Sequence, residues 1–385
     1  MMIEIKNGRI VTPTEVIEGK SLYIDEDRIA DIGEAGRQVE KSIDAHGRYV
    51  LPGFIDIHSD KIEKIINPRP TSVFDFELGL KECEKELLQL GITTVFHSFS
   101  LNKDDIFGKS ILRQKGNVIK LANLISDIHN RNHLIHHRCH LRLEIDNLEA
   151  YDIAKDMMEK NLVHEISFMD HTPGQGQYKD IAVYEKSIEI GEGKTFEEIL
   201  DSHKNKETLS FDQLKDLADI AHSKNITVAS HDDDSEEKLM LNQKLGVDIS
   251  EFPITLEVAK KAKEMGYYTV IGSPNILLGG SHSGNMSAAE AIINDCGDIL
   301  CADYYPQAIL HSIFIMYNKY GVPLPEMVKK ASLNPARATR IDKEYGSIEL
   351  GKKADIIIVD ELDGYPIITH VLVDGRTTSR VEYRR

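Results

Sequence analysis

The sequence predicts an α/β protein built around a (β/α)8 barrel of the TIM type, with a small β-sandwich domain formed by both termini. Eight apolar, strand-like runs alternate with charged, helix-like segments between residues 51 and 306. Strand-then-helix repetition produces a parallel sheet, and eight repeats close it into a barrel. The two ends of the chain contain short strand-like runs joined by tight turns. We therefore expect residues 1–50 and 334–385 to form the sandwich, and residues 51–333 to form the barrel.

The terminal segments carry turn signals between alternating runs. Asn7-Gly8 lies at the centre of IEIKNGRIV, and Asp374-Gly375 lies within the segment that begins ADIIIVD. Asn-Gly and Asp-Gly favour the tight turns of β-hairpins, because these residues tolerate positive φ. Each pair therefore predicts a hairpin in the small β-domain.

The composition limits the classes of partner. The chain has 385 residues, is 41% hydrophobic and carries a formal net charge of -17, which argues against general binding of nucleic acid or of an anionic membrane. The four cysteines lack paired metal-ligand spacing, the N-terminus lacks a signal-peptide pattern, and no apolar run could span a bilayer. We expect a cytoplasmic protein that takes a small substrate, with a homodimer as the default assembly.

The expected barrel strands end in polar residues. The eight runs are 51–60, 92–100, 133–146, 162–171, 226–234, 247–253, 267–275 and 298–306. Barrel enzymes build their sites at the C-terminal ends of the strands. These ends supply His58, Asp60, His97, Glu144, Asp170, His171, His231, Glu251 and Asp303. The convergence of so many polar residues on one rim predicts a functional site.

The first run, LPGFIDIHSD, ends in a histidine and an acid two positions apart. Side chains alternate between the faces of a strand, so Asp56, His58 and Asp60 are expected on one face. Imidazole and carboxylate ligands suit zinc, manganese, iron or nickel. His58 and Asp60 are therefore predicted metal ligands, and the alternative is a hydrogen-bonded pair at the rim.

The third run, HHRCHLRLEID, places Arg138, Arg142 and Glu144 on one face by the same alternation. Glu144, nearest the rim, is the candidate for a carboxylate that bridges two metal ions, and Asp170 competes for this role. The alternative is an internal salt-bridge ladder that joins the two arginines to Glu144. A buried face this polar must be either paired or functional.

Three later strand ends add candidates. His171 precedes the turn-rich stretch TPGQGQ, His231 ends ITVASH, and Asp303 follows the last apolar run. Asp303 could both contact a metal ion and accept a proton from a bound water.

Residues 272–288 and the turn NPRP predict contacts with phosphate. Glycines allow the backbone to approach a ligand closely, and neutral donors come from Asn275, Ser281, His282, Ser283 and Asn285. Arg69, in NPRP, could hold a phosphate with two hydrogen bonds. The alternatives are a flexible loop with an incidental histidine, and a surface salt bridge for Arg69.

These motifs resemble the amidohydrolase superfamily. LPGFIDIHSD is similar to its first-strand signature, and NPARA at 334–338 followed by GSIELGKKADIIIVD is similar to its return into the β-domain. NPRP, MDHTPGQ, ASHDDDS, GSPNILLGGSHSGN and ADYYP resemble one subgroup, the alpha-D-ribose 1-methylphosphonate 5-triphosphate diphosphatases of phosphonate degradation. The sequence departs from the commoner superfamily pattern, since Asp60 replaces the second histidine of HxH and no lysine on the fourth strand is available for carboxylation.

The resemblance implies a metal-dependent hydrolase that cleaves the triphosphate to the 5-phosphate and pyrophosphate. It implies two divalent metal ions, with the ligands His58, Asp60, Glu144, His171, His231 and Asp303, and Asp303 also as the catalytic base. The substrate contacts would come from Arg69, Asn275, Ser281, His282, Ser283 and Asn285. One alternative is hydrolysis of a C–N bond, as in deaminases, cyclic amidases or aminoacylases. An alternative of another class is a metal-free barrel that serves as an assembly scaffold.

Overall fold

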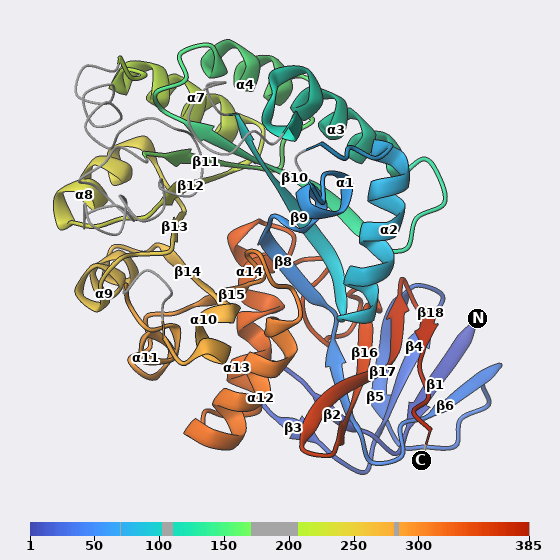
Figure 1. Ribbon diagram of the computed structural model, residues 1–385. Helices are drawn as coiled ribbons and strands as arrows, with labels where there is room; N and C mark the ends of the chain where they lie inside the picture. The colour runs from blue at the N-terminus through green and yellow to red at the C-terminus, as the bar shows by residue number, and fades with distance from the viewer. Residues whose placement is uncertain (70, 102–110, 171–206, 281–284, 385) are drawn as a thin grey trace.

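The structure, a computed structural model, describes residues 1–69, 71–101, 111–170, 207–280 and 285–384 (Figure 1). An eight-stranded parallel sheet forms a barrel, and two smaller sheets form a separate domain that holds both chain termini. The predicted fold class, a (β/α)8 barrel with a terminal β-domain, is confirmed.

The barrel strands follow one another around the sheet in sequence order. They are β8 (Phe54–Ser59), β9 (Ile92–Leu101), β10 (His136–Glu144), β11 (Glu165–Met169), β12 (Thr227–His231), β13 (Ile249–Glu251), β14 (Tyr268–Gly272) and β15 (Ile299–Cys301). The ring closes between its last and first strands at their C-terminal ends. The amide of Asp303 donates to the carbonyl of His58 at 2.9 Å, and the amide of Asp60 donates to the carbonyl of Asp303 at 3.1 Å.

Helices cover the outside of the barrel (Figure 1). They are α1 (Lys61–Ile66), α2 (Phe76–Gln89), α3 (Lys115–Ile128), α4 (Ala150–Glu159), α7 (Phe211–Ser223), α8 (Glu236–Leu245), α9 (Leu256–Glu264), α10 (Ser273–Leu278), α11 (Ala288–Ile293), α12 (Ala308–Tyr320), α13 (Leu324–Lys330) and α14 (Leu333–Ala338), with a 3-10 turn at Ile111–Arg113. In α2, the side chain of Asp75 accepts the amide of Leu78 and so caps the helix N-terminus. Leu80, Cys83 and Leu87 recur at helical spacing and are fully buried, which fixes the face that α2 turns to the barrel.

Apolar side chains fill part of the inside of the barrel. Ile57, Phe96, Ile249 and Val270 form one buried cluster there with Ala336, which α14 contributes. Because this interior is packed, the polar strand ends gather at the opposite, C-terminal rim. This packing therefore confines the functional site to that rim.

The small domain consists of two sheets with a shared core. One sheet has the order β5-β4-β1-β6 and the other β18-β17-β16-β7-β2-β3. Their strands are β1 (Met2–Lys6), β2 (Arg9–Val11), β3 (Val16–Ile17), β4 (Ser21–Asp25), β5 (Arg28–Gly33), β6 (Lys41–Asp44), β7 (Tyr49–Pro52), β16 (Ile356–Leu362), β17 (Tyr365–Val373) and β18 (Arg376–Arg380). Ile5, Leu22, Ile356 and Leu372 pack together in their core, so residues from both ends of the chain stabilise one unit.

The two turn predictions had different outcomes. Asp374-Gly375 joins the antiparallel pair β17 and β18, with Val373 opposite Arg376, as predicted. The hairpin predicted at Asn7-Gly8 is wrong, because β1 pairs with β4 and β6 while β2 pairs with β3 and β7. The turn instead carries the chain from one sheet to the other. The positive φ of 56° at Asn7 explains the residue choice without requiring a hairpin.

No helix within the described ranges has both the length and the apolar content needed to cross a bilayer. All four cysteines, Cys83, Cys139, Cys296 and Cys301, are free and buried. They therefore act as small apolar side chains in the core.

Candidate active site

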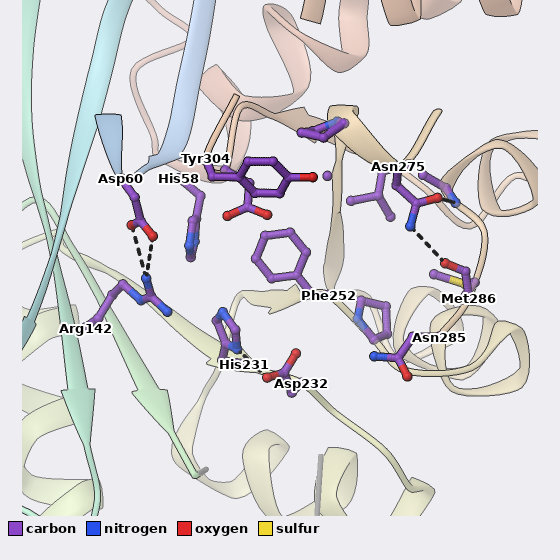
Figure 2. A pocket seen from close by; sticks show the side chains of 16 residues that line it. His58, Asp60, Arg142, His231, Asp232, Phe252, Asn275, Asn285, Met286 and Tyr304 are labelled. Atoms are coloured by element: carbon purple, nitrogen blue, oxygen red, sulfur yellow. Dashed lines mark hydrogen bonds and ion pairs between the residues drawn. The ribbon is translucent and has the colours of Figure 1, made fainter. Parts of the chain in front are cut away.

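A pocket of about 290 Å³ opens at the C-terminal rim of the barrel (Figure 2). Its wall comes from the ends of β8, β10, β12, β13, β14 and β15 and the segments that follow them. The residues that line it are His58, Asp60, Arg142, His231, Asp232, Phe252, Pro253, Ile271, Gly272, Pro274, Asn275, Asn285, Met286, Ala288, Asp303 and Tyr304. Six residues predicted from the sequence thus meet in one place, namely His58, Asp60, His231, Asn275, Asn285 and Asp303.

The other predicted residues lie elsewhere. Glu144 ends β10 and is buried, but it is not among the residues that line the pocket. Arg69 is exposed in a short turn, where it pairs with Ser72. The predicted residues His171, Ser281, His282 and Ser283 lie outside the described residues. The roles proposed for all of these residues stay predictions.

His58 and Glu251 form a buried pair at the floor of the site. Nδ1 of His58 lies 2.6 Å from Oε1 of Glu251, and the two side chains are 1% and 0% exposed. Burial alone would lower the pKa of His58, but the Glu251 carboxylate outweighs it and raises that pKa. Burial alone would raise the pKa of Glu251, but His58 and His140 outweigh it and lower that pKa. Nδ1 of His58 is thus held by the Glu251 carboxylate, and Nε2 is the remaining ring nitrogen of His58.

The donors around Glu251 fit a divalent metal ion. One ligand atom from each of His58, His231 and Glu251 lies within 4.8 Å of the others, and His140 and Glu165 form a second such group with Glu251. Oε2 of Glu251 is buried without a hydrogen-bond partner among the described residues, 3.8 Å from Nε2 of His140. This set combines imidazole and carboxylate donors, and it includes a buried carboxylate oxygen that has no hydrogen-bond partner among the described residues. Such donors suit zinc or a related ion.

Glu251 was recognised in the sequence as a polar strand end but was not predicted to be a ligand. In the structure, β12 and β13 pair in parallel with His231 directly opposite Glu251. This register places both side chains on the same face of the sheet. The signal that could have identified Glu251 is this register, which depends on strand pairing and cannot be read from one strand alone.

Asp60 is held by an arginine from a different strand. Nη1 of Arg142, on β10, lies 3.1 Å and 3.4 Å from the two carboxylate oxygens of Asp60. Burial raises the pKa of Asp60, but Arg142 and then His58 outweigh this effect and lower it. For Arg142, the alternative predicted for β10, a ladder with Glu144 in the same strand, is thus replaced by a bridge to Asp60 at the end of β8, on the other side of β9 (Figure 2).

Asp56 does not share the face of His58 and Asp60, contrary to the expected alternation. It is fully buried and accepts the amide of Ala302 at 2.9 Å, in the segment that closes the barrel. The pairing of β8 with β9 shifts register between Asp56 and Ser59, which interrupts the alternation of side chains. Burial raises the pKa of Asp56 to about 7. Its role in the structure is to hold β15 against β8.

The backbone at three strand ends is strained. Asp232, Phe252 and Asp303 have φ of 53°, 53° and 52°, and all three line the pocket. Residues other than glycine pay on the order of 1 kcal/mol or more for this conformation, and such residues cluster at functional sites. Burial also raises the pKa of Asp303, although the positive charge of His58 opposes that shift. Backbone strain and carboxylates with a raised pKa are both common at functional sites, which agrees with a site at this rim.

Asn275 fixes the opposite wall. Its Oδ1 accepts the amide of Ala288 at 2.9 Å, and its Nδ2 donates to the carbonyl of Met286 at 3.4 Å (Figure 2). These bonds hold residues 286–288 across the pocket from His58. The adjacent Asn285 also lines the pocket.

Comparison with known proteins agrees with the fold. The chain is 29% identical to the alpha-D-ribose 1-methylphosphonate 5-triphosphate diphosphatase of Escherichia coli (strain K12), over 97% of this chain and 99% of the relative. It is 24% identical to an imidazolonepropionase from Picrophilus torridus, over 94% and 92% of the two chains. The crystal structure of N-acetylglucosamine-6-phosphate deacetylase from Pasteurella multocida superimposes with a TM-score of 0.67 at 14% identity, over 99% of this chain and 100% of that one.

The family model described as "Amidohydrolase family" matches residues 49–378, which include the whole barrel and the return into the small domain. With its rim of histidines and carboxylates, this chain belongs to the amidohydrolase family.

Proposed function

We propose that the protein hydrolyses alpha-D-ribose 1-methylphosphonate 5-triphosphate between its alpha and beta phosphorus atoms, giving the 5-phosphate and pyrophosphate. The observation that carries the proposal is one pocket lined by His58, His231 and Asp303, with Glu251 buried next to the two histidines. The full-length similarity to the Escherichia coli diphosphatase suggests the substrate. The ligand is thus proposed to be a small phosphorylated anion.

The residues proposed to hold two divalent ions are His58, Asp60, Glu144, His171, His231 and Asp303, to which Glu251 is added. Such ions lower the pKa of a bound water toward neutrality and offset the charge of a phosphate. Glu251 supports this arrangement by binding Nδ1 of His58, which fixes the ring and reserves Nε2 for a ligand. Zinc, manganese, iron and nickel all suit these donors, so availability decides among them.

Asp303 is proposed to take the proton of the attacking water. Its carboxylate lines the pocket together with His58 and Asp60, and a positioned carboxylate can accept a proton from a bound water. As the proton moves to Asp303, the water oxygen bonds to the alpha phosphorus, and the bond from that phosphorus to the bridging oxygen breaks. Pyrophosphate leaves with the bridging oxygen and its electron pair. The predicted substrate contacts are Arg69, Asn275, Ser281, His282, Ser283 and Asn285.

Phosphorus NMR of the triphosphate incubated with the metal-loaded protein tests the proposal. We expect the signals of a 5-monophosphate and of pyrophosphate to appear together. Orthophosphate with a 5-diphosphate would instead indicate cleavage at the gamma phosphorus. An unchanged spectrum from folded, metal-loaded protein would refute the proposal, and a purified protein that binds almost no metal would favour a scaffold.

The second candidate is hydrolysis of a C–N bond. The observation that favours it is the similarity to imidazolonepropionase over 94% of this chain. An activated water attacks a carbonyl carbon as readily as a phosphorus atom, so the metal donors suit both reactions. Turnover of cyclic amides by protein that leaves the triphosphate unchanged would support this candidate.

A further inference from the structure

We propose that Arg142 binds a phosphate oxygen of the substrate and thereby selects anionic substrates for this pocket. The inference rests on the proposed function for the identity of the substrate. It assigns to β10 a positioning and binding residue that the sequence had suggested only as a member of a salt-bridge ladder.

The first argument is charge. Among the described residues that line the pocket, Arg142 is the only arginine or lysine. Arg69, the arginine expected to hold phosphate, is exposed and does not line the pocket. Arg113 is occupied by Glu63, with its Nε and Nη2 3.1 Å from the carboxylate oxygens. An anion that enters the pocket therefore meets the guanidinium of Arg142.

The second argument is the direction of the donors. Nη1 of Arg142 donates to Asp60, and Nε donates to Sδ of Met169 at 3.1 Å. Within the described part of the chain, Nη2 makes no hydrogen bond. Figure 2 shows Arg142, Asp60 and His58 converging on the same space. The two bonds hold the planar guanidinium in place, and Nη2 is left to contact a ligand.

The third argument is burial. The side chain of Arg142 is 11% exposed, so a phosphate that reaches it is bound away from bulk water. Charge-assisted hydrogen bonds in such surroundings are short and strong. An uncharged cyclic amide or amine carries no negative charge that would need this group. Arg142 therefore favours anionic substrates over uncharged C–N substrates.

A competing role is that of a counter-ion. Four carboxylates, those of Asp60, Glu251, Glu144 and Asp303, act on Arg142 electrostatically. In that role the arginine would only keep the carboxylates, and any metal bound to them, in position. The two roles predict different losses when Arg142 is replaced. Loss of a counter-ion would weaken metal binding, whereas loss of a phosphate-binding residue would weaken anion binding.

The experiment measures both losses. Arg142→Gln and Arg142→Lys are compared with wild type and with Arg113→Gln, a control that removes an ion-paired arginine outside the pocket. For each folded, metal-loaded protein, metal content is measured and the Kd of inorganic pyrophosphate is determined by calorimetry. We expect Arg142→Gln to weaken pyrophosphate binding by roughly 10- to 100-fold with metal content unchanged. Arg142→Lys should be intermediate, because it keeps the charge and loses the planar donors.

The outcomes separate this inference from the proposed function. Wild-type affinity for pyrophosphate in Arg142→Gln, with or without loss of metal, would overturn the inference. If Arg142→Gln does not fold, wild-type affinity in Arg142→Lys would overturn it. Pyrophosphate binding that depends on Arg142, in a protein that leaves the triphosphate intact, would refute the proposed function and support the inference. A wild-type protein that binds no pyrophosphate would refute both.

Discussion

Nδ1 of His58 lies 2.6 Å from Oε1 of Glu251, so the first and sixth strands of the barrel meet in a buried hydrogen-bonded pair beneath the pocket. The pair fixes the orientation of His58, because a ring held at one nitrogen can present only the other to a ligand. Outer partners of this kind are often almost as important for metal affinity as the ligands themselves. Glu251 also lies opposite His231 in the neighbouring strand, so one carboxylate is adjacent to two imidazoles.

Glu251→Gln should weaken metal binding. The amide removes the negative charge that holds His58, and loss of such a partner typically costs about 10- to 100-fold in metal affinity. The measurement is competition with a chelator for the bound ion. Unchanged affinity would show that Glu251 neither holds His58 for a metal nor binds one.

Glu165→Gln is the matched control, on β11, which is separated from β13 by β12. Glu165 is fully buried, and burial followed by repulsion from Glu251 raises its pKa well above the usual range. Both effects favour the neutral carboxyl, so an amide of the same shape should leave metal affinity unchanged. A loss equal to that of Glu251→Gln would instead place a metal ion in the group of His140, Glu165 and Glu251.

Asp303→Asn should abolish turnover while the fold and most of the metal remain. The amide cannot accept the proton of water, and removal of a general base costs roughly 10²- to 10⁴-fold in rate. The bonds that Asp303 makes to His58 and Asp60 use its backbone, so the barrel closure does not depend on the carboxylate. The check is kcat together with circular dichroism and metal content. An active, folded variant would remove Asp303 from the proposed mechanism.

Much of the site could be predicted because the parallel strands of a barrel end at one rim. That rule alone brings His58, Asp60, His231 and Asp303 together, whatever the details of packing. Partners from different strands could not be predicted in the same way. Arg142 and Asp60 are 82 residues apart, and their bridge depends on the registers in which β8 and β10 pair with β9 between them.

Local alternation failed where the backbone is irregular. Asp56 was expected beside His58, but the register shift in β8 turns it toward Ala302 instead. Asn7-Gly8 was expected to form a hairpin, but the sandwich uses this turn to pass between sheets. In both cases a rule based on neighbouring residues failed, because the packing of the whole barrel or of the whole sandwich determines the backbone there. A local sequence pattern carries no information about that packing.

His164 should make the protein sensitive to acid. Nδ1 of His164 accepts the amide of Cys139 at 3.2 Å, and burial, assisted by Arg138, lowers the pKa of His164 to about 3. The unfolded chain has a histidine pKa near 6.5, so between these values the unfolded state binds more protons. The stabilisation is thus present above pH ~6.5 and is lost as the pH falls toward ~3.

His164→Asn should flatten this dependence, because an amide oxygen can accept the same N–H and does not titrate. Between pH 6 and 4, the stability of the variant should fall less steeply than that of wild type, by up to about 1.4 kcal/mol per pH unit. Urea unfolding at several pH values measures the free energy of unfolding and its pH dependence. His46→Asn, at a histidine whose side chain is 67% exposed, is the control and should run parallel to wild type. If the stability of His164→Asn also falls with pH in parallel with wild type, His164 is not the source of the acid sensitivity.

Gly375→Ala should destabilise the small domain more than Gly364→Ala. Both glycines lie in Asp-Gly turns of the same sheet, with φ of 70° and 82°, so both alanines pay a similar backbone cost of about 1 kcal/mol. A Cβ at Gly364 meets nothing within 4 Å, whereas a Cβ at Gly375 would overlap the carbonyl oxygen of Glu26 and touch Ile24. Because a backbone oxygen cannot rotate away, the turn or β4 must move, at a further cost of roughly 1–3 kcal/mol. The difference between the two urea midpoints measures the contact between the C-terminal turn and the N-terminal strands. Equal midpoints would mean that the two ends of the chain are not packed as tightly as this contact requires.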